Sequence, residues 1–412
     1  MKILNQLVCV AILALVLGLQ SCNQASTQEQ SSQLQTDNTA NNASAIPVTS
    51  SDTTAKEKTA YPAPQAHRKY NDFARLVAGL PLEGDSQYKK YDTLKAYKEF
   101  AGSLGRSWTK IDSSRFSRMR EWAKTELAEA NKDNTDLFYP FSGPDFVNAY
   151  TLFPNANNYT LIGLEAIIAF PNLDKFNKKM VDNYFFSVAE SIEDLLEKSY
   201  FLTRRMEKDF QRGKAEGILP ALTLFIVRTG NVITNIERIE LDENGKYILS
   251  SIDSGKTSIR GVKVSFYNPS NNRPRSVSYF RQDASDDGLK KYPNFLKMLQ
   301  NMPTSNAYFK SASYLLHFPY FTTLRPLVLE KARFIMQDDT GVPFRFLTRD
   351  KWDITVYGTY DKPIKDFTYM GQRDLKNYYD SLKKINGVKP MPFDLGYHWG
   401  TKDNNLIRAI KK

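Results

Sequence analysis

Histidine and cysteine are scarce in this sequence, which has three histidines and two cysteines among 412 residues. Cys9 and Cys22 both lie in the first 22 residues, so the rest of the chain has no thiol for a disulfide, for thiolate catalysis or for cysteine-ligated zinc. The histidines are His67, His317 and His398, and none has the partner of an HExxH motif. A histidine-rich zinc site is therefore not expected, and no cofactor is predicted.

Long apolar runs are also rare, and the sequence has one, from Ile3 to Leu19. Its length of about 17 residues is short for a membrane-spanning helix, and Lys2 gives it the positive start of a signal peptide. Leu19-Gln20-Ser21-Cys22 then resembles a lipobox, the motif of bacterial lipoproteins. We expect residues 1–21 to be a signal peptide and Cys22 to carry lipid, including palmitate. Ordinary secretion and an uncleaved anchor are the alternatives.

The residues after Cys22 lack large apolar side chains. Residues 22–65 are rich in Ser, Thr, Gln, Asn and Ala, and such a segment cannot bury enough surface to offset its ordering entropy. We predict a disordered tether over 22–65 and a globular part over 66–412, in one domain or in two lobes, about 66–215 and 216–412. Asn23, in place of the Asp that retains enteric lipoproteins in the inner membrane, is typical of an outer-membrane lipoprotein that faces the periplasm.

Acidic residues are outnumbered, since 56 Lys and Arg against 45 Asp and Glu give a net charge of +11. The predicted tether holds four acidic residues and two lysines, so the excess lies in the globular part. Its charge suggests anionic partners, such as envelope glycans or lipid headgroups. A generic basic surface is the alternative, because the positive residues are scattered. No nucleic-acid recognition motif is present, and nucleic acid is not an expected partner.

The order of helical and strand patterns predicts an α+β fold rather than a doubly wound sheet. The N-terminal part is helical, with helices over 88–100 and 112–130 and one long helix over 174–210. In that long helix an apolar seam runs from Val181 to Met206 in steps of three and four. The seam is typical of a core helix, and docking of a partner protein along it is the alternative.

A central antiparallel meander of about five strands follows, with Asn244-Gly245 as a hairpin turn. Its strands are predicted over 219–227, 232–241, 247–252, 258–267 and 275–280. The C-terminal part is mixed, with helices over 286–300, 306–317 and 321–331 and strands over 333–336 and 352–360.

Carboxylates gather in turn-rich, aromatic segments. Asp145 lies in one such segment, and Glu165 lies near the end of the next predicted strand, over 159–168. Asp338 and Asp339 directly follow the strand over 333–336. Carboxylates at strand ends can act as general acid and base in glycosidic hydrolysis, or as ligands for a hard cation. Capping of turns by Asp side chains is the alternative.

His317 is a further catalytic candidate, with a structural role at a helix end as the alternative. Asp283 and Asp287 match the first positions of a calcium loop and are weak candidates for metal ligands. The match fails later, because Lys291 and Asn294 stand at the ninth and twelfth positions. Helix capping is therefore the preferred role of the two aspartates.

Three strings resemble blocks of a family of uncharacterised bacterial envelope proteins, several of which are lipoproteins. The strings are FYPFSGPDF (138–146), QDDTGVPFRF (337–346) and WDITVYGTYDKPIKDF (352–367). The resemblance extends over most of 130–400. It implies a shared architecture and no particular activity, cofactor or catalytic residue.

Taken together, these features predict a lipid-anchored protein of the bacterial envelope that binds an envelope component, or assists assembly, without catalysis. One alternative is an envelope hydrolase of glycan or cell-wall substrates that uses Asp145 and Glu165 with Asp338 or Asp339. The other is a structural protein that docks a partner through the 174–210 helix.

Overall fold

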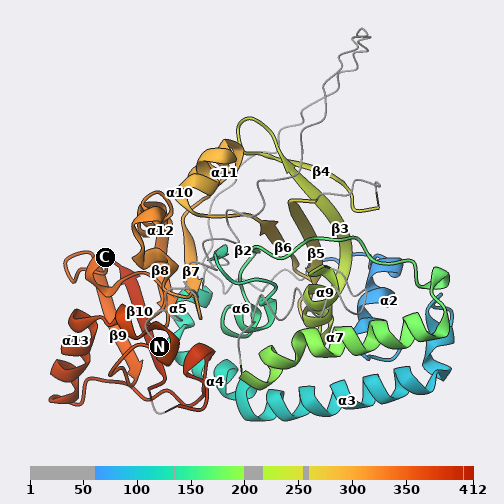
Figure 1. Cartoon of the computed structure of the whole chain (residues 1–412), viewed down its shortest axis with the longest axis horizontal. Helices are drawn as coiled ribbons and strands as arrows, with labels where there is room; N and C mark the ends of the chain where they lie inside the picture. The colour runs from blue at the N-terminus through green and yellow to red at the C-terminus, as the bar shows by residue number, and fades with distance from the viewer. Residues whose placement is uncertain (1–60, 133–134, 199–216, 254–258, 402) are drawn as a thin grey trace, which may run out of the picture. The chain divides into compact units, whose positions relative to one another are not determined.

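A computed structural model describes residues 61–132, 135–198, 217–253, 259–401 and 403–412, which belong to one compact unit (Figure 1). The predicted signal peptide, Cys22, most of the predicted tether and the end of the predicted long helix lie outside the described residues. Within these ranges, no helix has the length and apolar composition needed to cross a membrane.

A mixed sheet of ten strands forms the centre of the unit, in the order β4-β3-β5-β6-β2-β1-β7-β8-β10-β9. The five central strands, from β6 to β8, are parallel. Antiparallel strands flank them on both sides. The strands are β1 (Leu137–Tyr139), β2 (Asn158–Gly163), β3 (Val232–Leu241), β4 (Tyr247–Ser251), β5 (Gly261–Tyr267), β6 (Pro274–Arg281), β7 (Ser305–Phe309), β8 (Ala332–Gln337), β9 (Trp352–Gly358) and β10 (Asn405–Lys411).

The predicted central meander of about five antiparallel strands is wrong, because β3, β4 and β5 are one flank of a larger mixed sheet. The predicted strand over 219–227 is helix α9 (Leu219–Arg228), which is apolar and buried on all sides and so lacks a helical period. The predicted helix over 306–317 begins within strand β7, whose five residues are all buried. Fully buried strands are short continuous runs, which sequence periodicity cannot distinguish from helix.

Helices cover both faces of the sheet, and each face has its own apolar core. Along β1, Leu137 and Tyr139 point to the first core and Phe138 to the second, as the pleat requires. The first face carries α2 (Arg68–Val77), α3 (Lys95–Ile111), α4 (Ser117–Glu126), α5 (Ala128–Lys132), α6 (Phe146–Leu152), α7 (Lys178–Lys198) and α9. The second carries α10 (Asp286–Lys291), α11 (Pro293–Asn301), α12 (Leu324–Lys331) and α13 (Arg373–Lys383).

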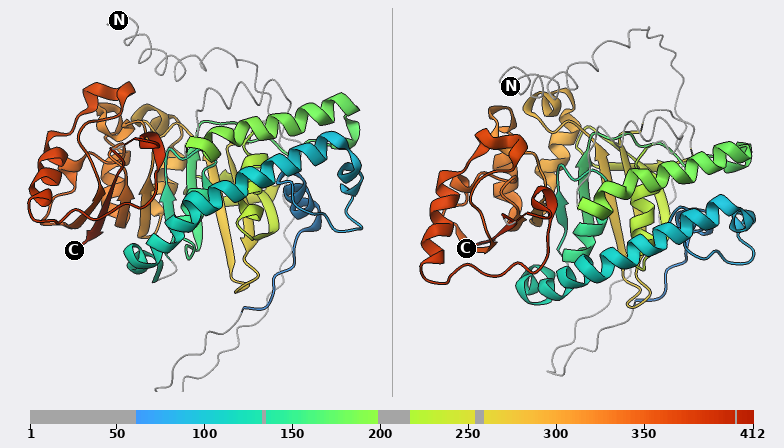
Figure 2. Two further views of the ribbon diagram at one scale, coloured as in Figure 1. Left: turned by 90° about the horizontal axis from the view of Figure 1, so that it is seen from below. Right: turned by 60° about the horizontal axis from the view of Figure 1, so that its bottom comes forward.

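The apolar seam of the long helix belongs to the first core. In α7, Val181, Phe185, Val188 and Ile192 are buried, and the ring of Phe185 stacks on Phe100 of α3 with 5.2 Å between the centroids. Figure 2 shows the two helices side by side in both views. This stretch of the seam therefore packs the core, where a partner protein has no access to it.

The strand order reverses between β1 and β7. From β1 the chain continues to β2 and later β6 on one side, and it then returns to place β7 and β8 on the other side of β1. In open sheets of this kind, ligands bind beyond the carboxyl ends of the strands, near the point of reversal. We call the end of the sheet where the five parallel strands finish the carboxyl edge.

Candidate functional site

The loops at the carboxyl edge contain an unusual number of left-handed residues. Phe141 follows β1, and Ser311, Ser313 and Tyr314 follow β7, all with φ between 52° and 63°. Non-glycine residues adopt this conformation at a cost, and they do so most often where surrounding contacts hold a loop in a required shape. Four of the six left-handed non-glycine residues in the described part of the chain therefore lie in the loops at the point of strand reversal.

Asp145 lies in the loop after β1 and caps α6. Its Oδ1 accepts hydrogen bonds from the backbone and side chain of Asn148, at 3.3 and 2.9 Å, and its Oδ2 accepts one from Tyr139 at 2.9 Å. The same Oδ2 forms a buried ion pair with Lys310, the first residue after β7. Burial lowers the pKa of Lys310, and the charge of Asp145 opposes that shift. The pair thus joins two central strands at the point of reversal.

Asp338 follows β8 and orders two loops. Its carboxylate accepts hydrogen bonds from the backbone N–H of Ser311 at 2.8 Å and from the backbone and hydroxyl of Thr340 at 3.0 and 2.5 Å. Burial, and next the charge of Asp339, raise the pKa of Asp338 to about 6. Asp338 thus combines a local turn with a contact to the neighbouring loop.

Asp339 faces different partners. It accepts hydrogen bonds from Tyr314 at 2.5 Å and from Asn405 at 3.1 Å, and its Oδ1 lies 2.8 Å from Nε2 of His398. Burial by itself lowers the pKa of His398, but the hydrogen bond and the charge of Asp339 outweigh it and raise that pKa. We call Asp145, Lys310, Asp338, Asp339 and His398 the sealed cluster, because each is at most 3% exposed.

Glu165 lies beside the loop after β1 and is also buried. It accepts a hydrogen bond from Tyr279 at 2.9 Å, and a Cβ on Gly143 would lie 3.4 Å from its Oε1. The sheet therefore brings all four predicted carboxylates to one edge. None of them lines an open cleft among those described, and the residues 395–401 lie across Asp338 and Asp339.

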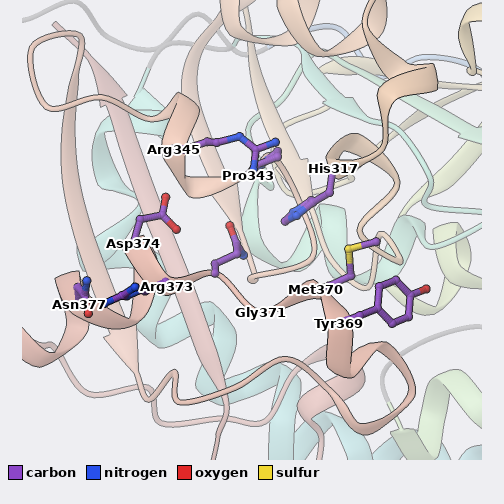
Figure 3. A pocket seen from close by; sticks show the side chains of 10 residues that line it. His317, Pro343, Arg345, Tyr369, Met370, Gly371, Arg373, Asp374 and Asn377 are labelled. Carbon is purple, nitrogen blue, oxygen red and sulfur yellow. The ribbon is translucent and has the colours of Figure 1, made fainter.

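A pocket of about 540 Å³ opens beside the sealed cluster. The segments after β7, β8 and β9 form it, because β8 and β9 are both antiparallel to β10 and so run in the same direction. Figure 3 shows His317, Met370 and Tyr369 on one side, Asp374, Arg373 and Asn377 opposite, and Arg345 between them. We call this space the His317 pocket. Its remaining lining residues are Pro343, Gly371 and Gln372.

His317 is the predicted catalytic residue that reaches this pocket. Burial lowers the pKa of His317 to about 4; the charge of Asp339 opposes the shift, and Arg345 and Arg325 add to it. Its Nε2 is buried and has no hydrogen-bond partner among the described residues. Gln372 separates the pocket from the sealed cluster, donating to the carbonyl of Asp339 at 2.8 Å and accepting from the backbone of Phe344 at 2.7 Å.

The two weak candidates for metal ligands, Asp283 and Asp287, do not form a metal site. Asp283 accepts a hydrogen bond from the backbone of Ser285 at 2.9 Å, and Ser285 caps α10, the helix that contains the exposed Asp287. Across the described ranges, no three His, Cys, Asp or Glu side chains gather in a way that could hold a metal ion. The calcium-like string is the start of a capped helix.

Sequence reasoning missed Lys310, His398, Arg345 and Gln372 as parts of these sites. Lys310 was overlooked because the segment that contains β7 has a helical pattern, so the residue was not recognised as following a strand. His398 and Gln372 come from loops with no periodic signal, and they reach Asp339 through tertiary contacts. For Lys310, the one signal in the sequence was a basic residue directly after a strand.

A comparison of the chain with protein-family models, curated proteins and solved structures finds no match. The resemblance of its three strings to bacterial envelope proteins therefore stays a prediction.

Proposed function

We propose that this protein is a lipid-anchored component of the bacterial envelope that binds an anionic envelope component, without catalysis, in the His317 pocket. The observation that carries the proposal is a contrast between the predicted carboxylates, which a ligand cannot reach, and the arginines of the pocket, which it can. The predicted carboxylates are buried and hydrogen-bonded within the protein, whereas Arg345 and Arg373 of the pocket are exposed. Binding energy comes from groups that a ligand can reach and that have no partner yet.

The charge of the pocket supports an anionic ligand. Arg345 and Arg373 are exposed, and within the described part of the chain neither forms a salt bridge with an acidic side chain. Asp374 offsets one of the two positive charges. Arginine is well suited to carboxylate, sulfate and phosphate groups because its planar fork can donate two parallel hydrogen bonds.

An aromatic side chain at the rim supports a sugar as the carrier of that charge. Tyr369 is 57% exposed, and an exposed ring next to polar groups can pack against the apolar face of a sugar. The net charge of +11 also favours the approach of an acidic polymer. An acidic envelope glycan is therefore the preferred ligand, as the composition of the chain also indicates.

The test uses the full chain and oligogalacturonate, an acidic glycan, with a neutral cello-oligosaccharide as the comparison. Isothermal titration calorimetry measures both affinities for the wild type, for Arg345→Gln and for the matched control Arg349→Gln. Arg349 is exposed and lies outside the pocket, over the ring of Tyr378. Loss of one charge-assisted contact is expected to weaken binding about tenfold in Arg345→Gln and to leave Arg349→Gln unchanged.

Two results would contradict the proposal. Equal losses of affinity in Arg345→Gln and Arg349→Gln would assign binding to the basic surface as a whole. If the wild type does not bind oligogalacturonate, acidic glycans are excluded as the ligand.

A hydrolase is the second candidate, favoured by the four left-handed residues at the point of strand reversal. Its chemistry would need residues 395–401 to move, since a Cβ on Gly396 would lie 2.7 Å from Oγ of Ser311 and 3.0 Å from Oδ2 of Asp338. Release of reducing sugars from cell-wall glycan tests it. Loss of release in Asp338→Asn at unchanged stability, with release kept in the exposed control Asp287→Asn, would favour the hydrolase.

A further inference from the structure

A row of aromatic rings leads away from the rim of the His317 pocket. Tyr369, which lines the pocket, lies 6.4 Å from Phe367 between ring centroids. Phe367 in turn lies 6.5 Å from Tyr397, with the planes of the two rings 25° apart. Trp399 follows two residues after Tyr397, at most about 7 Å further along the chain. We call Tyr369, Phe367, Tyr397 and Trp399 the aromatic row, which joins two loops that are distant in the sequence.

The two ends of the aromatic row are open to solvent. Tyr369 is 57% exposed and Trp399 is 41% exposed, whereas Phe367 and Tyr397 between them are partly buried. Large aromatic side chains gain free energy when they leave water, so two exposed rings on neighbouring loops form a surface that a ligand can cover. One end lies at the pocket and the other lies beyond its lining residues.

Contacts with the sealed cluster hold the loop of Trp399 in place. His398, the residue before Trp399, has its Nε2 2.8 Å from Oδ1 of Asp339. The hydroxyl groups of Tyr397 and Ser313 lie 2.8 Å apart. A binding surface that is already ordered loses less conformational entropy when a ligand arrives. The far end of the aromatic row is therefore fixed relative to the carboxyl edge of the sheet.

The charges beside the aromatic row favour an acidic ligand. Lys362 and Lys365 are exposed in the segment that leads to Tyr369, and the exposed Asp366 offsets one of them. Residues 395–401 contain no acidic side chain. Aromatic rings pack against the apolar faces of sugars, and positive groups attract their acidic substituents. Rings and cations together fit a chain of acidic sugars better than a neutral or purely apolar partner.

We propose that the aromatic row is a second subsite for the acidic glycan whose first charged sugar occupies the His317 pocket, so that the protein binds an extended chain. This inference rests on the proposed function and adds the length of the ligand to its charge. One sugar packs against Tyr369 at the rim, and a later sugar of the same chain packs against Trp399. The second contact is intramolecular once the first has formed, so it adds affinity without a second loss of translational freedom.

The test compares oligogalacturonates of two, four and six sugars by isothermal titration calorimetry on the full chain. The variant is Trp399→Ala, which removes the exposed ring at the far end of the row. The matched control is Tyr247→Ala, because Tyr247 is 37% exposed and lies on β4, an edge strand of the sheet.

We expect the wild type to bind the hexamer about tenfold more tightly than the dimer, the scale of one aromatic contact. Trp399→Ala should lose this gain with dimer affinity unchanged, and Tyr247→Ala should keep it. Equal affinity of the wild type for dimer and hexamer would overturn the inference. A gain that persists in Trp399→Ala would also overturn it, because a repeating chain can occupy a single pocket in more positions as it lengthens. In both cases the proposed function stands, whereas failure of all three oligomers to bind would overturn the proposed function itself.

Tryptophan fluorescence gives a second readout at the residue concerned. Trp399 is the most exposed tryptophan in the described part of the chain, since Trp122 and Trp352 are at most 8% exposed and Trp108 is partly buried. Saturating hexamer should protect Trp399 from quenching by acrylamide, and saturating dimer should not. Trp399→Phe keeps a ring, so it should retain most of the gain in affinity and lose the change in quenching. Quenching that the hexamer leaves unchanged, or equal protection by dimer and hexamer, would contradict a second subsite at Trp399.

Discussion

The sealed cluster and the His317 pocket lie next to each other at the carboxyl edge, separated by Gln372, yet their polar groups are used in opposite ways. Asp145, Asp338 and Asp339 each have several partners within the protein. In the pocket, Arg345 is exposed and forms no salt bridge within the described residues. The comparison teaches that a buried carboxylate at a strand end can be explained by the fold, whereas an exposed cation beside a cavity is free to contact a ligand.

Removal of Lys310 should have the largest effect on stability. Lys310→Met leaves Asp145 buried with its charge uncompensated, and loss of one partner of such a pair costs about 3–5 kcal/mol in the free energy of unfolding. Urea unfolding measures the change. The double variant Lys310→Met with Asp145→Asn removes both charges and should recover most of the loss. A single variant that loses less than about 1 kcal/mol would show that the cluster does not stabilise the fold.

The two buried histidines should give opposite dependences of stability on pH. The folded-state pKa of His317 is about 4, below its ordinary value near 6.5, so the unfolded state binds more protons and stability falls as pH drops from 6.5 towards 4. The pKa of His398 is raised, so its contribution is complete below pH 6.5 and is lost as pH rises through the folded value.

Urea unfolding over a pH series, with His317→Phe and His398→Phe, tests this difference. Relative to the wild type, His317→Phe should lose less stability in acid and His398→Phe should lose less at rising pH. The same slope in both variants would mean that the two rings share one environment.

Substitution of Arg345 in the pocket should have the smallest effect on stability. Arg345→Gln changes an exposed side chain that has no salt bridge within the described residues, so the free energy of unfolding should stay within about 0.5 kcal/mol of the wild type. Thermal and urea unfolding measure it, alongside the loss of ligand affinity. A destabilisation above about 1 kcal/mol would place Arg345 among the structural residues and remove the contrast with the sealed cluster.

Sequence patterns predicted most of the strands better than the two short central ones, β1 and β7. β3 has the predicted bounds, Val232 to Leu241, because one face is polar and the strand alternates. β1 and β7 lie between parallel neighbours and are too short and uniformly buried to give a pattern. Their order follows from contacts far apart in sequence, so the parallel centre and the point of reversal could not be derived.

The carboxylates of the candidate site could be predicted from the sequence, but the residues that contact them could not. Turn strings around Asp145 and Asp338 indicated capping, and both side chains do accept local backbone hydrogen bonds. Lys310 forms an ion pair with Asp145, and His398 contacts Asp339; both come from segments that approach only after folding. The pocket was beyond reach for the same reason, because it forms between the segments that follow three different strands.

The position of β1 has a consequence for how this chain is made. Its three residues pair on one side with β2 and on the other with Asn306 and Ala307 of β7, so the centre of the sheet cannot close until the last third of the polypeptide is present. Such distant pairing is slow to form and leaves apolar strand edges open meanwhile. A chain that is synthesised or exported from its amino terminus would therefore keep the β7 side of β1 unpaired until the segment with β7 has followed.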